Sequence, residues 1–146
     1  MGLIRLAILT YIPMKPVQNV CSNLKFSNSV MKRFQCIHRG LNMLKGRITE
    51  RRLYDIYHSG SGCEFELSLL VSVMRPGNVD KFLKRADAFI RFKENLLLDG
   101  NEIQEILNTG PTPLIGEIQA DKHRQRFLGT IRNRAECRRW ILSNFT

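Results

Sequence analysis

A chain of 146 residues suits one domain or one compact helical array, because roughly 68–70% of the unfolded surface can be buried at this size. The 23 Lys and Arg residues outnumber the 13 Asp and Glu residues, and the resulting net charge of +10 favours a polyanionic partner. The apolar stretch 3–12 is interrupted by Arg5 and is far shorter than the roughly 20 residues that span a bilayer, so no membrane partner is expected.

The first part of the chain predicts two helices. Residues 3–12 place apolar side chains at helical spacing until Pro13 stops the pattern. After a polar connector, Ser27 or Asn28 can cap a second helix that runs to about Leu44. The side chains expected to pack inward in the connector and this helix are Leu24, Phe26, Val30, Met31, Phe34, Ile37, Leu41 and Leu44.

Three further helices are predicted in the middle of the chain. Thr49 precedes a helical pattern over 51–57, and two glycines follow it as a stop signal. The stretch 64–74 is strongly apolar and predicts a buried helix, whereas 79–98 has the spacing of a long amphipathic helix. The inward positions of the first of these helices are Leu53, Ile56 and Tyr57, and the glycines are Gly60 and Gly62.

The segment 99–116 predicts a short helix, a rigid corner and the start of a second helix. Asp99 or Asn101 can cap the short helix, and Gly110 is placed to end it with a left-handed residue. Two prolines then set the direction of the next helix, because a proline is tolerated in a first turn whose amides have no helical partner. These prolines are Pro111 and Pro113, and the apolar face of the second helix begins with Leu114, Ile115 and Ile118.

The last predicted helix begins at a capping box formed by Asn133 and Glu136 and packs Trp140 inward. With no convincing alternating strand, the sequence predicts an all-α fold, a compact array of about seven to eight short helices. We expect a single helical region over 1–146, with body-like helices in 1–98 and tail-like helices in 99–146.

Three groups of motifs, met in the same order, resemble one family. The sequences are RLAIL at 5–9 with LKFSN at 24–28, GNEI at 100–103 with GPTPLIG at 110–116, and RAECRRWI at 134–141. Together they resemble the C-terminal helical region of bacterial-type tRNA nucleotidyltransferases, the CCA-adding enzymes, and their poly(A) polymerase relatives. The match departs at Thr112, where the family usually has glycine, although the helix corner itself does not need that glycine.

The catalytic motifs of that family are not found in this sequence. Nucleotidyl transfer uses carboxylates that hold two metal ions, which the family places on a D-x-D strand after a Gly-Ser turn. No D-x-D occurs, and the Gly-Ser-Gly at 60–62 lies between two predicted helices. We therefore expect no catalytic residue, metal site or catalytic head here; Mg²⁺ and CTP or ATP would belong to the missing head domain, which another chain could supply.

Cysteine and histidine give no stronger catalytic signal. The four cysteines are widely scattered without a C-x-x-C pair, which predicts reduced thiols in a cytoplasmic protein. The three histidines have no nucleophile or carboxylate at an obvious spacing. The residues concerned are Cys21, Cys36, Cys63 and Cys137, and His38, His58 and His123.

Basic residues gather toward both ends of the chain. Residues 1–58 carry ten basic and two acidic side chains, and residues 119–146 carry seven and two. A rigid helical array with such ends suits a folded RNA that is recognised through its phosphates and 2′-hydroxyls. The predicted RNA-binding residues are Lys25, Lys32, Arg33, Arg51, Arg52, Lys122, Arg124, Arg126, Arg132, Arg134, Arg138 and Arg139.

The resemblance and the charge together predict an RNA-binding chain, with tRNA or another structured RNA as partner. In the family, this region would grip the tRNA body while the head extends the 3′ end, so the chain alone should transfer nothing. A helical protein-interaction or structural module with incidental basic charge is the alternative, and an intact enzyme of another type is a third. The sequence leaves open whether Met1 is a native start, whether the parent activity is CCA or poly(A) addition, and the oligomeric state.

Overall fold

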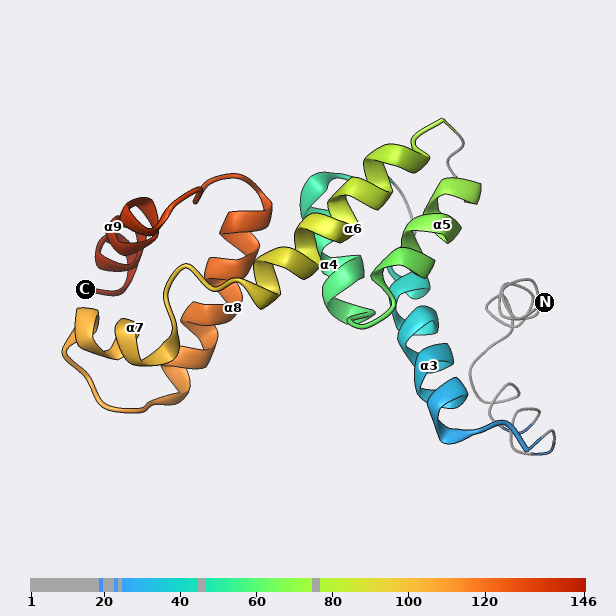
Figure 1. Ribbon diagram of the computed structural model, residues 1–146, viewed down its shortest axis with the longest axis horizontal. Coiled ribbons are helices and arrows are strands. Elements are labelled where there is room, and N and C mark those ends of the chain that lie inside the picture. The colour runs from blue at the N-terminus through green and yellow to red at the C-terminus, as the bar shows by residue number, and fades with distance from the viewer. Residues whose placement is uncertain (1–18, 20–22, 24, 45–46, 75–76) are drawn as a thin grey trace. The chain divides into compact units, whose positions relative to one another are not determined.

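The computed structural model describes residues 19, 23, 25–44, 47–74 and 77–146, and in these residues every regular element is a helix (Figure 1). The all-α prediction is therefore confirmed. The predicted helix over 3–12 and the side chain of Leu24 lie outside the described residues. The helices are α3 (Asn28–Asn42), α4 (Glu50–Ser59), α5 (Glu64–Met74), α6 (Val79–Glu94), α7 (Gly100–Leu107), α8 (Pro113–Phe127) and α9 (Arg134–Phe145).

The chain divides into two compact units, Met1–Asp87 and Ala88–Thr146, which we call the first and second units. The division falls inside α6, whereas the sequence suggested a change of character after Leu98. Residues 88–98 therefore pack with the helices that follow them. No described helix is long and apolar enough to cross a membrane.

The first unit packs α3, α4, α5 and the beginning of α6 around one apolar core. Ser27 and Thr49 cap α3 and α4, as predicted, because each hydroxyl accepts a hydrogen bond from the main chain three residues later. The predicted apolar faces are confirmed where the helices meet. The most deeply buried side chains of this unit are Phe34, Ile37, Leu53, Ile56, Tyr57, Leu67, Val71 and Ala86.

Two glycines allow the helices of the first unit to approach closely. A β-carbon built on Gly40 or on Gly60 would lie 2.7 Å or 2.3 Å from the side chain of Leu67, which is completely buried. Gly60 also ends α4, as predicted, with a φ of −105°. The need for glycine at position 60 is therefore steric, whereas Gly62 has a φ of 97° that favours glycine for conformational reasons.

Three predictions about apolar side chains in the first unit are wrong. Phe26 and Val30 are exposed although they were expected to pack inward. Helix α5 buries only one face, through residues such as Leu67 and Val71. Its opposite face is apolar and exposed, since positions four apart share one side of a helix. The exposed residues on that face are Phe65, Leu69 and Val73.

In the second unit, α7, α8 and α9 enclose a smaller core. Asp99 caps α7, which is one of the two predicted caps, and Glu102 completes a capping box as its reciprocal partner. The predicted left-handed stop is at Asn108, with a φ of 49°, and not at Gly110. Asparagine can take this role because its short polar side chain tolerates the left-handed region. The core residues are Leu98, Ile103, Ile115, Ile118, Ile131, Cys137 and Ile141.

Helices α8 and α9 begin where the sequence predicted. Pro113 starts α8 directly after Thr112, which supplies no side-chain cap. Asn133 caps α9 by accepting from the amide of Glu136 at 2.9 Å. The carboxylate of Glu136 reaches back to the amide of Arg132, at 2.8 Å, one residue earlier than in a standard capping box.

Helix α6 ends at Glu94, four residues before the predicted end at Leu98. The carbonyl groups that follow it are bound by basic side chains from α8 and α9. Arg126 donates to the carbonyl of Asn95, Arg134 to that of Leu97, and Lys122 to that of Leu98. These three contacts replace the hydrogen bonds that a longer helix would have made.

Candidate nucleic-acid interface

The seven basic residues predicted for RNA binding in the second unit do not form one surface. The carbonyl-bound cations, Lys122, Arg126 and Arg134, hold the chain after α6. Arg124 is half-buried. Four of the seven are exposed, namely Arg132, Arg134, Arg138 and Arg139. We call the three that do not hold the chain after α6, Arg132, Arg138 and Arg139, the α9 arginines.

The position of Lys122 in the structure corrects the prediction that this residue contacts RNA. Its side chain is only 3% exposed, and its Nζ atom donates to the carbonyl oxygen of Leu98. Burial lowers the pKa of Lys122, since an ammonium group loses its hydration inside the protein. A side chain placed in this way stabilises the second unit and is not presented to a phosphate.

The guanidinium group of Arg126 is partly enclosed within the second unit. It lies over the ring of Phe92, with 4.4 Å between the guanidinium carbon and the ring centre, and donates to the carbonyl of Asn95. Burial lowers the pKa of Arg126 from its usual high value without removing the charge. The residue therefore adds to the positive field of the unit while its donors are used internally.

Arg134 is exposed but anchored. It forms an ion pair with Glu102 and donates to the carbonyl of Leu97 at 3.4 Å. The pKa of Glu102 is lowered first by the amide of Asp99, in the capping box, and then by Arg134. Glu102 thus joins the start of α7 to the start of α9.

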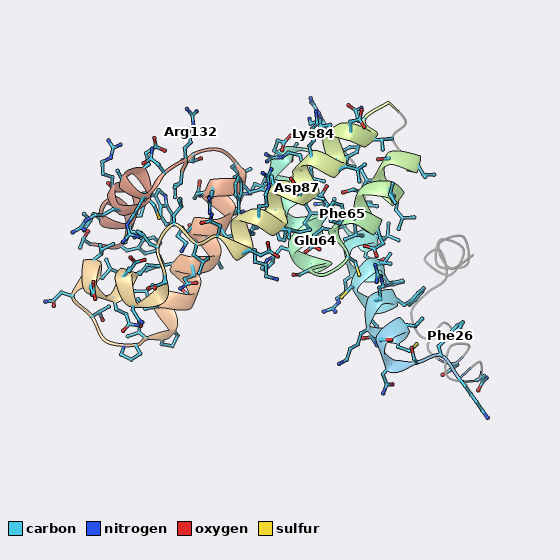
Figure 2. The ribbon with its side chains drawn as sticks, in the orientation of Figure 1. Phe26, Glu64, Phe65, Lys84, Asp87 and Arg132 are labelled. Carbon is cyan, nitrogen blue, oxygen red and sulfur yellow. The ribbon has the colours of Figure 1, made fainter. Side chains whose placement is uncertain are left out.

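The α9 arginines occupy the loop before α9 and the exposed side of that helix. Figure 2 shows Arg132 extending from the loop that joins α8 and α9, where Gly129 has a φ of 83°. The Nε atom of Arg132 donates to the carbonyl of Gly129 at 3.4 Å. Arg138 and Arg139 are adjacent on the second turn of α9, so their guanidinium groups leave the same end of the helix.

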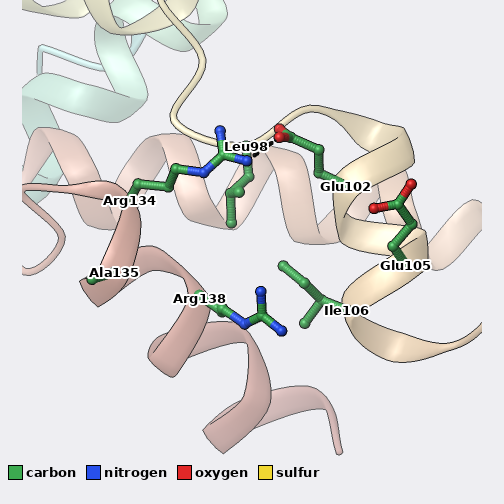
Figure 3. A pocket seen from close by; sticks show the side chains of 7 residues that line it. All are labelled: Leu98, Glu102, Glu105, Ile106, Arg134, Ala135 and Arg138. Carbon is green, nitrogen blue, oxygen red and sulfur yellow. Dashed lines mark hydrogen bonds and ion pairs between the residues drawn. The ribbon is translucent and has the colours of Figure 1, made fainter.

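A pocket of about 420 Å³ lies between α7 and α9, beside Arg138. Figure 3 shows Arg134 paired with Glu102 at one end, and Arg138 extending across the pocket toward Ile106. The pocket has an apolar floor between two carboxylates and two guanidinium groups. Its lining residues are Leu98, Glu102, Glu105, Ile106, Ala135, Arg134 and Arg138.

This pocket suits binding better than catalysis. None of its seven lining residues is a serine, cysteine or histidine, so they provide no ordinary nucleophile. In the described part of the chain, no three His, Cys, Asp or Glu residues are grouped to hold a metal ion. The sequence did not predict this pocket, and of its lining residues only Arg134 and Arg138 were expected to bind RNA.

The basic residues predicted in the first unit are also divided. Arg33 forms an ion pair with Glu66, and the Nε atom of Arg52 donates to the carbonyl of Met43 at 2.8 Å. The remaining predicted residues, Lys25, Lys32 and Arg51, are exposed. Lys32 lies near the beginning of α3, whereas Arg51 starts α4 beside the end of α3, so these two charges lie at opposite ends of that helix.

His123 and Trp140 are accounted for by packing in the second unit. The ring of His123 meets that of Phe89 edge to face, with 4.7 Å between centres, and His123 Nε2 lies 3.2 Å from the carbonyl oxygen of Phe89. Trp140 packs against Phe145 at the edge of the core, in agreement with the prediction that this side chain packs inward. Neither ring forms a stacking platform for bases.

The chain matches no family model, no curated protein and no solved structure.

Proposed function

We propose that this chain binds structured RNA, with tRNA as the leading candidate, through the α9 arginines. The observation that carries the proposal is their placement: the α9 arginines are exposed, whereas the three carbonyl-bound cations hold the chain after α6. Arg132 also donates to a carbonyl, but to that of Gly129 in its own loop. An arginine fork can hold a phosphate through two parallel hydrogen bonds. The carbonyl-bound cations beneath them add to the local positive potential.

The resemblance of the three motif groups supports the same proposal. By that resemblance the chain is the helical part of a tRNA nucleotidyltransferase or poly(A) polymerase-like protein, acts in tRNA 3′-end processing in the cytoplasm, and leaves nucleotide transfer to a separate head. Lys25, Lys32 and Arg51 would provide further phosphate contacts from the first unit. Recognition would rest on the shape of the RNA more than on its bases.

The size of the expected effect follows from counterion release. If the α9 arginines each neutralise one phosphate, the logarithm of the association constant should fall with the logarithm of salt concentration with a slope of about −2 to −3. Contacts from the first unit would make this slope steeper. A slope near zero would exclude phosphate contacts as the source of affinity.

The decisive experiment compares two double variants that each remove two positive charges. Arg138→Gln with Arg139→Gln should weaken binding to a folded tRNA roughly 10- to 100-fold and make the salt slope shallower by roughly 1.5 to 2. The control, Lys81→Gln with Lys84→Gln, changes two exposed residues of α6; the Lys81–Glu50 pair that it removes is a surface contact of 3.3 Å and contributes little to stability. Equal losses in the two double variants would contradict a specific role for α9.

The alternative, a helical protein-interaction or structural module, has one observation in its favour. Phe65, Leu69 and Val73 form an exposed apolar face on α5. This alternative expects association with a protein partner that is insensitive to salt, and no RNA binding even at low salt. Binding to both a tRNA and an unstructured RNA of equal length with the same affinity would leave only generic attraction to polyanions.

A further inference from the structure

Two cysteines of the first unit, 27 positions apart in the chain, are brought near each other where the loop before α5 meets α3. Cys36 is on α3 and is half-buried, whereas Cys63 directly precedes α5 and is 2% exposed. Both are free thiols. This pairing involves none of the residues in the proposed RNA interface.

The contacts of the two thiols are reciprocal. Cys36 Sγ donates to the carbonyl of Ser61 at 3.6 Å, and Cys63 Sγ donates to the carbonyl of Arg33 at 3.5 Å. Each sulfur therefore reaches the main chain next to the other cysteine. These two contacts place both sulfur atoms at the junction between α3 and the loop before α5.

Gly60 makes this close approach possible. A β-carbon at Gly60 would lie 3.1 Å from the carbonyl oxygen of Cys36, in addition to its clash with Leu67. The absence of a side chain therefore lets the loop before α5 rest against the third turn of α3. The geometry that places Cys63 beside Cys36 is thus built into the core of the first unit.

The two thiols have different surroundings. The Nη2 atom of Arg39 lies 3.7 Å from Cys36 Sγ. Burial is the main reason that the pKa of Cys63 is raised to about 11, with Cys36 beside it adding to the effect. Because Cys36 is half-buried and Cys63 is 2% exposed, Cys36 is the sulfur that a solvent oxidant meets first, and Cys63 is the more deeply buried partner behind it.

We propose that Cys36 and Cys63 form a redox-active pair, which a peroxide oxidises to a disulfide that joins α3 to the start of α5. In the first step the Cys36 thiolate attacks a peroxide oxygen, which gives a sulfenic acid and releases hydroxide. In the second step Cys63 gives its proton to that hydroxide and its sulfur attacks the sulfenic sulfur. A second hydroxide then leaves and takes up the proton that Cys36 released when it ionised. One peroxide and two thiols thus yield one disulfide and two waters.

The disulfide would close a loop that contains all of α4. Oxidation would therefore restrain α3, α4 and α5 together, which Figure 1 shows as the neighbouring helices of this unit. Cross-linking such a loop removes conformations from the unfolded chain, so the oxidised protein should unfold at a higher temperature than the reduced one. The expected change is an increase in the midpoint of thermal unfolding that dithiothreitol reverses.

The test treats the reduced wild-type chain with hydrogen peroxide and maps its disulfides by peptide mass spectrometry. We expect the protein to lose the mass of two hydrogen atoms and a peptide containing Cys36 to become linked to one containing Cys63. The same treatment in denaturant, where the fold no longer pairs the thiols, should give mixed linkages that include Cys21 and Cys137. A native protein that stays reduced, or that links its four cysteines without preference, would overturn the proposal.

Two variants separate the roles of the sulfurs. Cys63→Ser should stop at the sulfenic acid of Cys36, which a dimedone-type reagent labels, whereas Cys36→Ser should leave Cys63 reduced under the same treatment. Dimedone labelling at Cys63 in preference to Cys36 would contradict the assignment. The wild-type mapping decides whether the pair exists even if either variant folds poorly.

Discussion

Lys122 lies within the run Lys-His-Arg-Gln-Arg at 122–126, whose composition predicts a phosphate-binding surface. The structure gives these neighbours different environments, since Lys122 is buried and Arg124 and Arg126 are half-buried. A helix turns by about 100° per residue, so adjacent basic residues in one run point in different directions. Charge in the sequence therefore identified the region but not the side chains that reach solvent.

The burial of Lys122 gives a stability prediction. Lys122→Ala should lower the free energy of unfolding by about 2–4 kcal/mol, because it leaves a cavity and removes the donor to the carbonyl of Leu98. Lys122→Met, which keeps most of the volume, should cost less. Chemical denaturation measures both values. Arg139→Ala is the control, and its effect should stay within about 0.5 kcal/mol because that residue is exposed.

Tyr57 gives a prediction about alkaline pH. Burial raises the pKa of Tyr57 to about 12, and its hydroxyl group donates to the carbonyl of Phe82 at 2.9 Å. Between pH 10 and about 12 the unfolded chain loses the phenolic proton while the folded chain keeps it, so the folded state binds more protons. Stability should therefore fall as pH rises through this window.

The variant Tyr57→Phe isolates that titration. It should lose roughly 1–2 kcal/mol at neutral pH, because the buried hydrogen bond is removed. The free energy of unfolding of the variant should also fall less at alkaline pH than that of the wild type, by up to roughly 3 kcal/mol. Denaturant melts at neutral pH and above pH 10 measure the two effects. An unchanged alkaline decrease in the variant would show that another group causes it.

At the scale of elements, helix starts were predictable and two helix ends were not. Ser27, Thr49 and Asp99 cap helices through side chains that lie within three residues of the amides they bind, so a local pattern is enough. The end of α6 depends instead on Lys122, Arg126 and Arg134, which are distant in sequence. The left-handed residue after α7 was assigned to the glycine, although Asn108 adopts it.

The exposed face of α5 shows that local sequence also did not predict which side chains pack inward. The stretch 64–74 is strongly apolar, which predicts burial, but the described helices cover only the side that contains Leu67 and Val71. For the candidate interface, composition identified Arg134 and Arg138 as basic residues expected to contact RNA, but not the pocket that they line. Which cations bind carbonyls and which remain exposed depends on tertiary contacts that a single sequence does not contain.

Helix packing in the first unit gives a prediction for Gly60. Gly60→Ala should destabilise the protein by about 1–3 kcal/mol, because the added methyl group meets Leu67 in a core with no space. Gly110→Ala is the matched control, since nothing lies within 4 Å of its added methyl group. Urea unfolding compares the two variants. A neutral result for Gly60→Ala would show that the helices separate easily.

At the scale of the whole molecule, the net charge of +10 overstates the charge available to a partner. Arg33, Arg85 and Arg134 are paired with carboxylates, and Lys122 is buried. The remaining exposed cations in the two units are still consistent with an RNA ligand. Their contribution to affinity should decrease with salt, as expected for phosphate contacts at a protein surface.

If a separate head transfers the nucleotides, this chain alone should bind RNA without extending it. The purified chain, incubated with tRNA, Mg²⁺ and labelled CTP or ATP, should leave the RNA unextended while it binds the same RNA at low salt. Extension is read by denaturing gel electrophoresis and binding by titration. Template-independent incorporation of either nucleotide would refute the non-catalytic part of the proposal, and preferential binding of tRNA over unstructured RNA would support the rest.

The contacts that hold the chain after α6 can form only after the residues that make them have been synthesised. Lys122 follows Leu98 by 24 residues, Arg126 follows Asn95 by 31, and Arg134 follows Leu97 by 37. A ribosome therefore releases the apolar turn 95–98 before the side chains that bind its carbonyls exist. Until then, the local sequence favours continuing the helix to Leu98, as its periodicity predicts. The boundary of α6 is consequently fixed late, by residues that the nascent chain acquires last.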